Sequence, residues 1–158
     1  MDRSEERTSI EPIQVGVIML ALATAIIHIY LFLIEGFLGN GAMLPLFQFL
    51  FVGNFFAYVV LVAALYLPIS SVARFRPVIR AFLIAIAFAS ILSYFRVGVF
   101  DTLGNIDKVV EVLLIVAATA DAGMSGGESG GGRGAILQLV IGLAAGLGMF
   151  LFLSLFIG

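Results

Sequence analysis

One stretch decides the fold class of this chain: Ile13-Gln-Val-Gly-Val-Ile-Met-Leu-Ala-Leu-Ala-Thr-Ala-Ile-Ile-His-Ile-Tyr-Leu-Phe-Leu-Ile34. It contains no charged side chain. An α-helix rises about 1.5 Å per residue, so a helix over this stretch can cross a hydrocarbon core of roughly 30 Å. The stretch is too long for the apolar part of a cleaved signal peptide, and no small-residue cleavage site follows it. We therefore expect a retained transmembrane helix over residues 13–34.

The composition of the whole chain supports the same class. Of the 158 residues, 62% are hydrophobic and 11% are charged, whereas about 25% of the residues of a soluble domain are charged. A soluble fold of this size has too much surface for its volume to hide so many apolar side chains. In lipid the backbone must satisfy its own hydrogen bonds, so spanning segments are helices or closed barrels. The apolar runs are continuous and lack the alternating polarity of barrel strands, which predicts an all-α membrane protein.

Four further apolar stretches complete the predicted architecture, an all-α polytopic transmembrane helical bundle with five spans. The predicted spans are residues 13–34, 43–67, 78–100, 103–121 and 135–157. The chain then divides into a polar N-terminal tail, a four-helix transmembrane core, a Gly/Ser-rich linker and an additional transmembrane helix, over residues 1–12, 13–121, 122–134 and 135–158. The fourth span is the most polar, because its first turns carry Asp107, Lys108 and Glu111.

Serine and proline residues indicate where the helices begin and end. Ser9 is a candidate N-cap for the first helix, and Pro12 fits its first turn. Pro68 is expected to end the second span, and Pro77 to begin the third. A loop over residues 69–80 is therefore predicted between these two spans.

The distribution of basic residues predicts the orientation, because short loops rich in Lys and Arg stay on the cytoplasmic side. With five spans, the tail, the 69–80 loop and the glycine-rich linker share one side of the membrane. Together these segments hold Arg3, Arg7, Arg74, Arg76, Arg80 and Arg133. The opposite loops contain Glu35 and Asp101 and no basic residue. We therefore predict a multi-pass plasma-membrane protein with a cytoplasmic N-terminus and an external C-terminus.

Ionisable and polar side chains inside the predicted spans are the first candidates for function, because burying them in lipid is costly. Helical rise places most of them in the outer half of the bilayer. We predict an intramembrane polar cluster of His28, Asn54, Arg96, Asp107, Lys108 and Glu111. Asp107 and Glu111 are four residues apart and share a helix face. Tyr94 is two residues from Arg96, so it need not face the same pocket.

Each of these residues also has a purely structural interpretation. Glu111 could form an ion pair with a neighbouring cation, since buried charges need partners. Asp107 and Lys108 could lie in the headgroup zone. Asn54 could serve as an interhelical hydrogen-bonding residue, and His28 as a hydrogen-bonded packing histidine.

Cysteine and histidine counts exclude several kinds of chemistry. The chain has no cysteine, which excludes disulfides, thiolate metal sites and cysteine nucleophiles. It has one histidine, which excludes a His₂ or His₃ zinc centre and a haem with two axial histidines within a single chain. No nucleophile-elbow motif and no basic tract are present. We therefore expect no catalytic residue, no metal and no nucleic-acid partner, and we lean against an enzyme.

The last predicted span carries Gly142 and Gly146, which are four residues apart. Small residues at this spacing allow two helix backbones to approach closely. We expect these glycines to pack against a neighbouring span or a second copy of the chain. The predicted partners are the lipid bilayer and, through this span, a homo-oligomer or a larger membrane complex.

Four short motifs follow one another along the chain. They are Ile26-Ile-His-Ile-Tyr-Leu-Phe-Leu33, Phe51-Val-Gly-Asn54, Tyr94-Phe-Arg-Val-Gly98 and Asp107-Lys-Val-Val-Glu111. In this order the chain resembles a group of small prokaryotic multi-pass membrane proteins with four core spans. That group has a histidine in the first span, an asparagine in the second, an Arg-x-Gly end to the third and a glutamate in the fourth. The resemblance covers about residues 13–120 and implies an architecture rather than a chemistry.

Three functions are compatible with these features. The first is a structural or accessory membrane component, which needs only helix packing. The second is a small transporter or proton-coupled binding protein that uses the polar cluster. The third is a redox protein in which His28 binds haem at the interface of a homodimer; apart from this alternative, no cofactor is expected.

Overall fold

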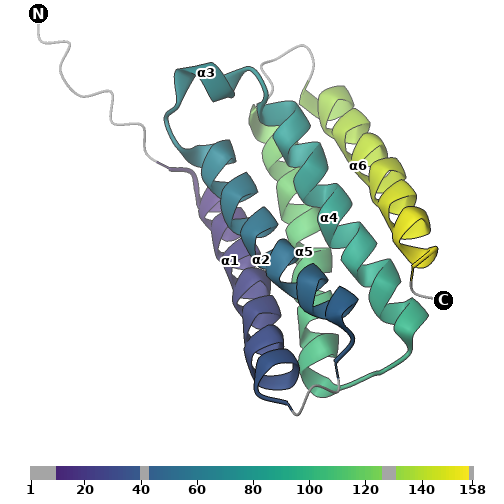
Figure 1. Ribbon diagram of the computed structural model, residues 1–158. Coiled ribbons are helices and arrows are strands. Elements are labelled where there is room, and N and C mark those ends of the chain that lie inside the picture. The colour runs from purple at the N-terminus through teal and green to yellow at the C-terminus, as the bar shows by residue number, and fades with distance from the viewer. Residues whose placement is uncertain (1–9, 40–42, 126–130, 157–158) are drawn as a thin grey trace, which may run out of the picture.

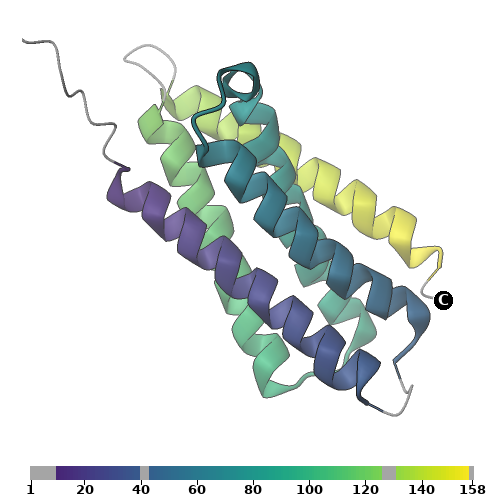
Figure 2. The same cartoon turned by 60° about the vertical axis from the view of Figure 1, so that its left-hand side comes forward.

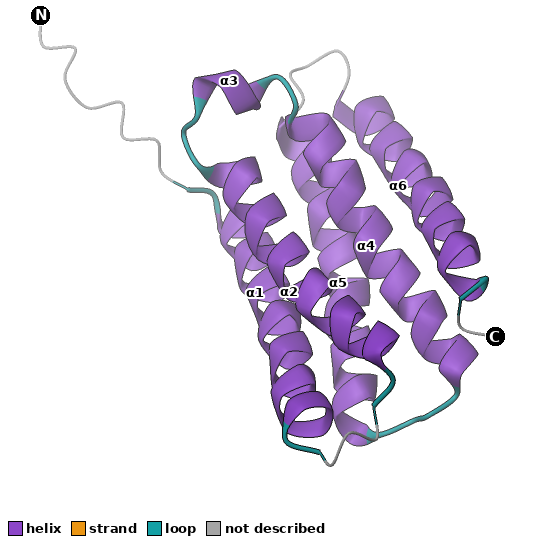
Figure 3. Cartoon of the chain, in the orientation of Figure 1, coloured by secondary structure: helices purple, strands orange, loops and turns teal. Residues whose placement is uncertain are grey.

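The computed structural model describes residues 10–39, 43–125 and 131–156. Within these ranges the chain is helical and contains no strand (Figure 3). The elements are α1 (Pro12–Leu31), the π-helical turn η1 (Phe32–Phe37), α2 (Pro45–Tyr66), α3 (Ser70–Ala73), α4 (Arg76–Val97), α5 (Thr102–Ser125) and α6 (Gly131–Ser154). The all-α class predicted from the sequence is confirmed for the part of the chain that the structure describes.

Five long helices run side by side and alternate in direction (Figures 1 and 2). α1, α2, α4 and α5 form a ring in which each helix packs against its two neighbours, and α6 covers the outer side of α4 and α5. α5 follows the whole length of the bundle and joins the end of α4 to the beginning of α6 at the other end (Figure 1). As a result, α1 begins at the end of the bundle opposite to the end where α6 stops.

Local chemistry explains where the helices begin and end. Pro12 stands in the first turn of α1, where its missing N–H costs nothing, and prolines also open α2 and α4. Glu11 is the N-cap of α1 and forms a capping box with Gln14. The expected cap, Ser9, lies outside the described residues. Gly98 ends α4 with a φ of 72°. α4, which corresponds to the third predicted span, therefore stops at Val97, short of the predicted end at residue 100.

Residues 122–134, expected to form a flexible linker, are partly helical. α5 continues to Ser125 and α6 already begins at Gly131; the remaining linker residues, 126–130, lie outside the described ranges. Ala122 and Ala135, at the facing ends of these two helices, are both buried. α5 and α6 pack against each other, and the helices extend into the predicted linker in spite of the entropic cost of ordering glycines.

Four of the five long helices are long and apolar enough to cross a membrane: α1 together with η1, α2, α4 and α6. α5 is equally long, but it carries Asp107, Lys108, Glu111 and Asp121. Large apolar side chains are exposed around the bundle, including Met19, Phe49 and Phe152, each at least 63% exposed. An apolar surface of this extent is unusual for a soluble monomer and typical of a lipid-facing one.

The interior of the bundle is built largely from small side chains. Its buried core consists of Val17, Ala21, Ala25, Tyr58, Val62, Leu83, Ile84, Ala87, Leu114 and Ala118. Alanines on the inner faces of α1, α4 and α5 allow the helix axes to approach closely, as is common in membrane bundles.

Gly142 and Gly146 lie against α4 of the same chain. A Cβ atom placed on Gly142 would lie 2.7 Å from Ile84 Cγ2, and one on Gly146 would lie 2.6 Å from the Ala85 carbonyl oxygen. Real Cβ atoms do not approach so closely, so α6 can occupy this position only because both residues are glycine. The small-residue spacing of α6 therefore serves a contact within the chain.

Replacing Gly146 by Ala is expected to lower the thermal stability of the purified protein in detergent, by about 1–3 kcal/mol. The added methyl group would meet the backbone of Ala85, which cannot rotate away. Gly148→Ala is the matched control, because a Cβ there has nothing within 4 Å. This control should be neutral or stabilising, since Ala favours a helix over Gly by up to about 1 kcal/mol. Equal melting-temperature changes for the two variants would contradict the packing.

Candidate functional site

One face of α5 carries the ionisable side chains of the bundle interior. Its buried residues include Asp107, Glu111, Leu114, Ala118 and Asp121, which succeed one another at intervals of four, three, four and three. This spacing keeps them on a single helix face. Because α5 packs against α1, α4 and α6, that face points into the bundle. Three carboxylates are thereby buried, and each needs a partner supplied by the surrounding helices.

Asp107 and Glu111 share one lysine. Lys108 Nζ lies 2.8 Å from Asp107 Oδ2 and 2.6 Å from Glu111 Oε2. It also donates a hydrogen bond to Ser90 Oγ on α4 at 2.6 Å. The side chain of Lys108 is 12% exposed, so the ammonium is held where competition from water is weak.

The second oxygen of each carboxylate accepts a hydrogen bond from a hydroxyl group. Thr24 Oγ1 on α1 donates to Asp107 Oδ1 at 2.6 Å, and Tyr58 Oη on α2 donates to Glu111 Oε1 at 2.8 Å. Both hydroxyl-bearing residues are fully buried. Side chains from α1, α2 and α4 therefore converge on two carboxylates of α5.

His28 completes the group and has a defined orientation. Its Nδ1 lies 2.8 Å from the Thr24 carbonyl oxygen, which can only accept, so Nδ1 carries the hydrogen. In the neutral imidazole Nε2 then has a free lone pair, and it lies 3.9 Å from Glu111 Oε1 and 3.5 Å from Ser90 Oγ. The ring lies between Phe51 and Tyr58, with centroid distances of 5.7 and 5.8 Å. We call His28, Asp107, Lys108 and Glu111 the His28 cluster.

The His28 cluster holds more negative than positive groups. Two carboxylates face one ammonium, and the histidine is charged only when protonated. An unbalanced charge is costly in a low-dielectric interior. The cluster can therefore accept a proton or another cation, which is the chemistry that the arrangement offers.

A cavity of about 480 Å³ borders the His28 cluster. It is lined by residues from the η1 end of α1, the beginning of α2 and the late turns of α4 and α6, with α5 completing the wall. His28, Asp107 and Lys108 contribute directly to its lining. Glu35 and Asp101, at the ends of their helices, add two more carboxylates. The remaining walls are mostly apolar.

The predicted site residues fall into three groups. His28, Asp107, Lys108 and Glu111 meet in one cluster, as the ion contacts show. Asn54 lines the neighbouring cavity. Arg96 is exposed near the end of α4 and forms no ion pair among the described residues, so the expected Arg96 contribution to the cluster is absent there.

The register of α4 explains the position of Arg96. Ser90, Ser93, Tyr94 and Val97 line the cavity at intervals of three, one and three. These positions share one helix face, and Arg96 lies to the side of it. Tyr94, whose direction the sequence left open, lines the cavity.

Two further residues of the site, Thr24 and Tyr58, were not among the predicted ones. Thr24 precedes His28 by four residues, and Tyr58 follows Asn54 by four. The i, i+4 rule places each pair on one helix face, so this signal was available in the sequence. That Tyr58 crosses the bundle from α2 to Glu111 on α5 follows only from the packing.

A second polar group lies toward the other end of the bundle. Arg80 Nη2 and Asp121 Oδ2 form an ion pair at 2.6 Å. Tyr66 Oη on α2 donates to the same Oδ2 at 3.0 Å, and Arg80 Nη1 donates to Gln138 Oε1 on α6 at 3.1 Å. Arg80 was expected in a loop, but α4 begins at Arg76 and buries Arg80 to 5% exposure.

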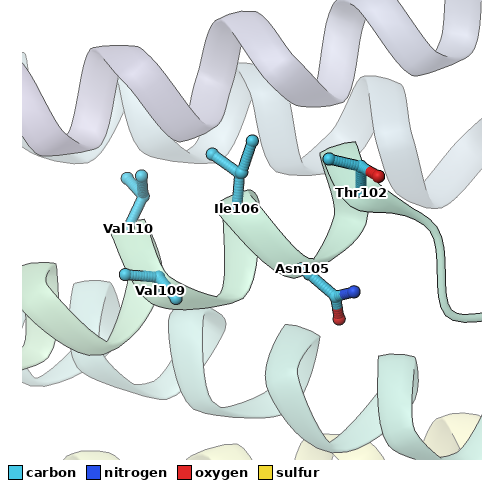
Figure 4. A pocket seen from close by; sticks show the side chains of 5 residues that line it. All are labelled: Thr102, Asn105, Ile106, Val109 and Val110. Atoms are coloured by element: carbon cyan, nitrogen blue, oxygen red, sulfur yellow. The ribbon is translucent and has the colours of Figure 1, made fainter.

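A separate hollow of about 370 Å³ lies on the outward side of α5 (Figure 4). It is lined by Thr102, Asn105, Ile106, Val109 and Val110. Ile106 and Val109 are at least half exposed, and no lining residue is ionisable. This hollow therefore belongs to the apolar outer surface rather than to the candidate site.

No family model, no curated protein and no solved structure matches this chain. The function must therefore be argued from the His28 cluster and its cavity.

Removing one member of the Arg80–Asp121 pair should destabilise the protein strongly, by about 3–5 kcal/mol, because the other charge would remain buried without its partner. We expect Arg80→Gln and Asp121→Asn each to lower the melting temperature in detergent. The double variant should lose less stability than the sum of the two single losses, since it leaves no isolated charge. Strict additivity would show that the two side chains are not energetically linked.

Proposed function

We propose that this chain is a five-span membrane protein that binds a small solute beside the His28 cluster and couples that binding to proton release. The single observation that carries the proposal is that His28, Asp107 and Lys108 belong both to a buried ionisable cluster and to the lining of a cavity of about 480 Å³. Intramembrane ionisable groups next to a cavity are characteristic of proton and solute pathways.

The path of α5 supports five spans rather than four. α4 ends at one end of the bundle and α6 begins at the other, so the connecting helix must traverse whatever its neighbours traverse (Figure 1). The charges that make α5 polar are buried and paired, so they need not face lipid. Paired charges facing a bundle interior are the form in which ionisable residues occur in membranes.

The orientation in the plasma membrane is proposed from the distribution of arginines, with the N-terminus cytoplasmic and the C-terminus external. The helix ends near Arg74 and Arg76 would then face the cytoplasm, and the cavity would lie toward the outside. Burial of Arg80 removes one loop charge from the count, which leaves Arg3, Arg7, Arg74, Arg76 and Arg133 on the predicted cytoplasmic side.

Reporter fusions test both the number of spans and the orientation. A reporter that is active only outside the cytoplasm should be active after Gly158 and inactive when inserted within residues 126–130. Activity at both positions, or at the linker alone, would contradict the five-span topology. A fusion at the N-terminus serves as the cytoplasmic control.

The charges of the cavity indicate the class of solute. Glu35, Asp101 and Asp107 line it, against one lysine, Lys108, and the imidazole of His28 among its described lining residues. The ammonium of Lys108 is already neutralised by Asp107 and Glu111. Since the surplus charge is negative and most of the wall is apolar, the cavity favours a small organic cation with an apolar body.

Cation binding and proton binding would exclude each other at this site. A proton on His28 Nε2 or on Glu111 removes the surplus negative charge of the cluster. A cationic solute in the cavity would repel that proton and would be bound best when the cluster is deprotonated. Binding of the solute therefore releases a proton, which is the basis of exchange across a membrane.

Neither the accessory function nor the haem function requires this arrangement. An accessory subunit needs packing alone, and packing does not explain a cavity lined by a histidine, a lysine and three carboxylates. A haem shared between two copies would need His28 on an outer face, whereas His28 is 2% exposed. Likeness to small prokaryotic four-span membrane proteins, and association through the outer face of α6, remain proposals that rest on the sequence.

Proton release tests the coupling. When purified protein in weakly buffered detergent is titrated with organic cations of increasing apolar size, at least one cation should acidify the solution, as measured with a pH-sensitive dye. Glu111→Gln should reduce the release, because it removes a proton-accepting carboxylate while keeping the side-chain shape. Arg96→Gln is the matched control at the same end of the bundle and should behave like the wild type. Equal release by wild type and Glu111→Gln, or none from either, would refute the coupling.

A further inference from the structure

The donor atoms of the His28 cluster have the arrangement of a metal site. His28, Asp107 and Glu111 each offer one ligand atom, and these atoms all lie within 4.8 Å of one another. All three side chains are at most 2% exposed. We propose that this cluster binds one divalent transition-metal ion between His28, Asp107 and Glu111. The proposal does not depend on solute coupling, because it concerns equilibrium binding of the ion alone.

Neighbouring groups fix the orientation of the three side chains. Lys108 holds Asp107 Oδ2 and Glu111 Oε2, and the other two oxygens lie beside the His28 ring: Asp107 Oδ1 is 3.8 Å from Nδ1, and Glu111 Oε1 is 3.9 Å from Nε2. His28 donates its Nδ1 hydrogen to the Thr24 carbonyl, so the lone pair of Nε2 is the one that could bind a metal ion. A metal-binding histidine is commonly held in this way, with its other nitrogen bonded to a backbone carbonyl or a carboxylate.

The separations are close to those required. Nitrogen and oxygen ligands lie about 2.0–2.2 Å from a metal such as zinc, so two ligands of one ion are at most about 4.3 Å apart. His28 Nε2 and Glu111 Oε1 are 3.9 Å apart, within that limit. Since all the ligand atoms lie within 4.8 Å of one another, they would need to close by no more than about half an ångström to bind one ion.

The charge and ligand types define the class of ion. The cluster has a surplus negative charge, which a bound cation would offset. One imidazole nitrogen with two carboxylate oxygens is a mixed set that suits Mn²⁺, Fe²⁺ or Zn²⁺, whereas Mg²⁺ and Ca²⁺ prefer oxygen alone. Thr24 Oγ1 lies 2.6 Å from Asp107 Oδ1 and 3.5 Å from Glu111 Oε1, where it can act as a fourth ligand or hold a bound water. The adjoining cavity gives the ion a route, because His28 and Asp107 line it.

Metal analysis of the purified full-length chain tests the proposal. After dialysis against Zn²⁺ or Mn²⁺, the wild type should retain about one ion per chain, and Mg²⁺ at the same concentration should not displace it. His28→Gln and Glu111→Gln should each weaken binding by more than about tenfold. In the Mn²⁺ form, electron spin-echo modulation should show an imidazole nitrogen in the wild type and none in His28→Gln.

Asp121→Asn is the matched control, because it removes a buried carboxylate from the same face of α5 at the other polar group. It should keep the wild-type metal affinity even if its melting temperature falls, which separates loss of a ligand from loss of stability. The proposal is overturned if the wild type retains neither ion. Retention that is unchanged in both His28→Gln and Glu111→Gln would also overturn it.

Discussion

Three carboxylates on one buried helix face set the main constraint on this molecule. Asp107, Glu111 and Asp121 on α5 are all at most 2% exposed, and an unpaired charge at such a position would cost several kcal/mol. Their direct partners come from three other helices: Thr24 and His28 on α1, Tyr58 and Tyr66 on α2, and Arg80 on α4. Ser90 on α4 and Gln138 on α6 hold Lys108 and Arg80 in turn. These contacts fix α1, α2 and α4 relative to α5 directly, and link α6 through Arg80.

The two polar groups along α5 differ in a way that bears on function. At one end, Arg80 and Asp121 form a one-to-one ion pair, which Tyr66 and Gln138 complete. At the other end, the His28 cluster has a surplus negative charge and borders a cavity. Leu114 and Ala118 separate the two groups with apolar packing. One end is thus electrostatically complete, whereas the other carries the surplus negative charge on which the proposed binding of a proton, a metal ion or a cationic solute depends.

Sequence reasoning found part of this site and missed another part for identifiable reasons. His28, Asp107, Lys108 and Glu111 could be found because an ionisable residue in an apolar run is rare. Arg96 was included because of its depth, and depth does not decide which side of a helix a residue faces. Asp121 was placed at the end of the fourth predicted span, and Arg80 at the end of a predicted loop. Composition gave no sign that α5 would bury Asp121 or that α4 would bury Arg80.

By itself, the sequence determined that the described part of the chain is helical with long apolar helices, where most of those helices begin, and that any histidine chemistry is limited to one side chain. Those properties depend on local features: runs of apolar residues, prolines in first turns and residue counts. Only the tertiary structure decided which charges are paired, that Gly142 and Gly146 meet α4 of the same chain, and that Tyr58 reaches Glu111 across the bundle. Such contacts join residues far apart in the sequence, and their geometry follows from the rotation of each helix about its axis, which no local pattern specifies.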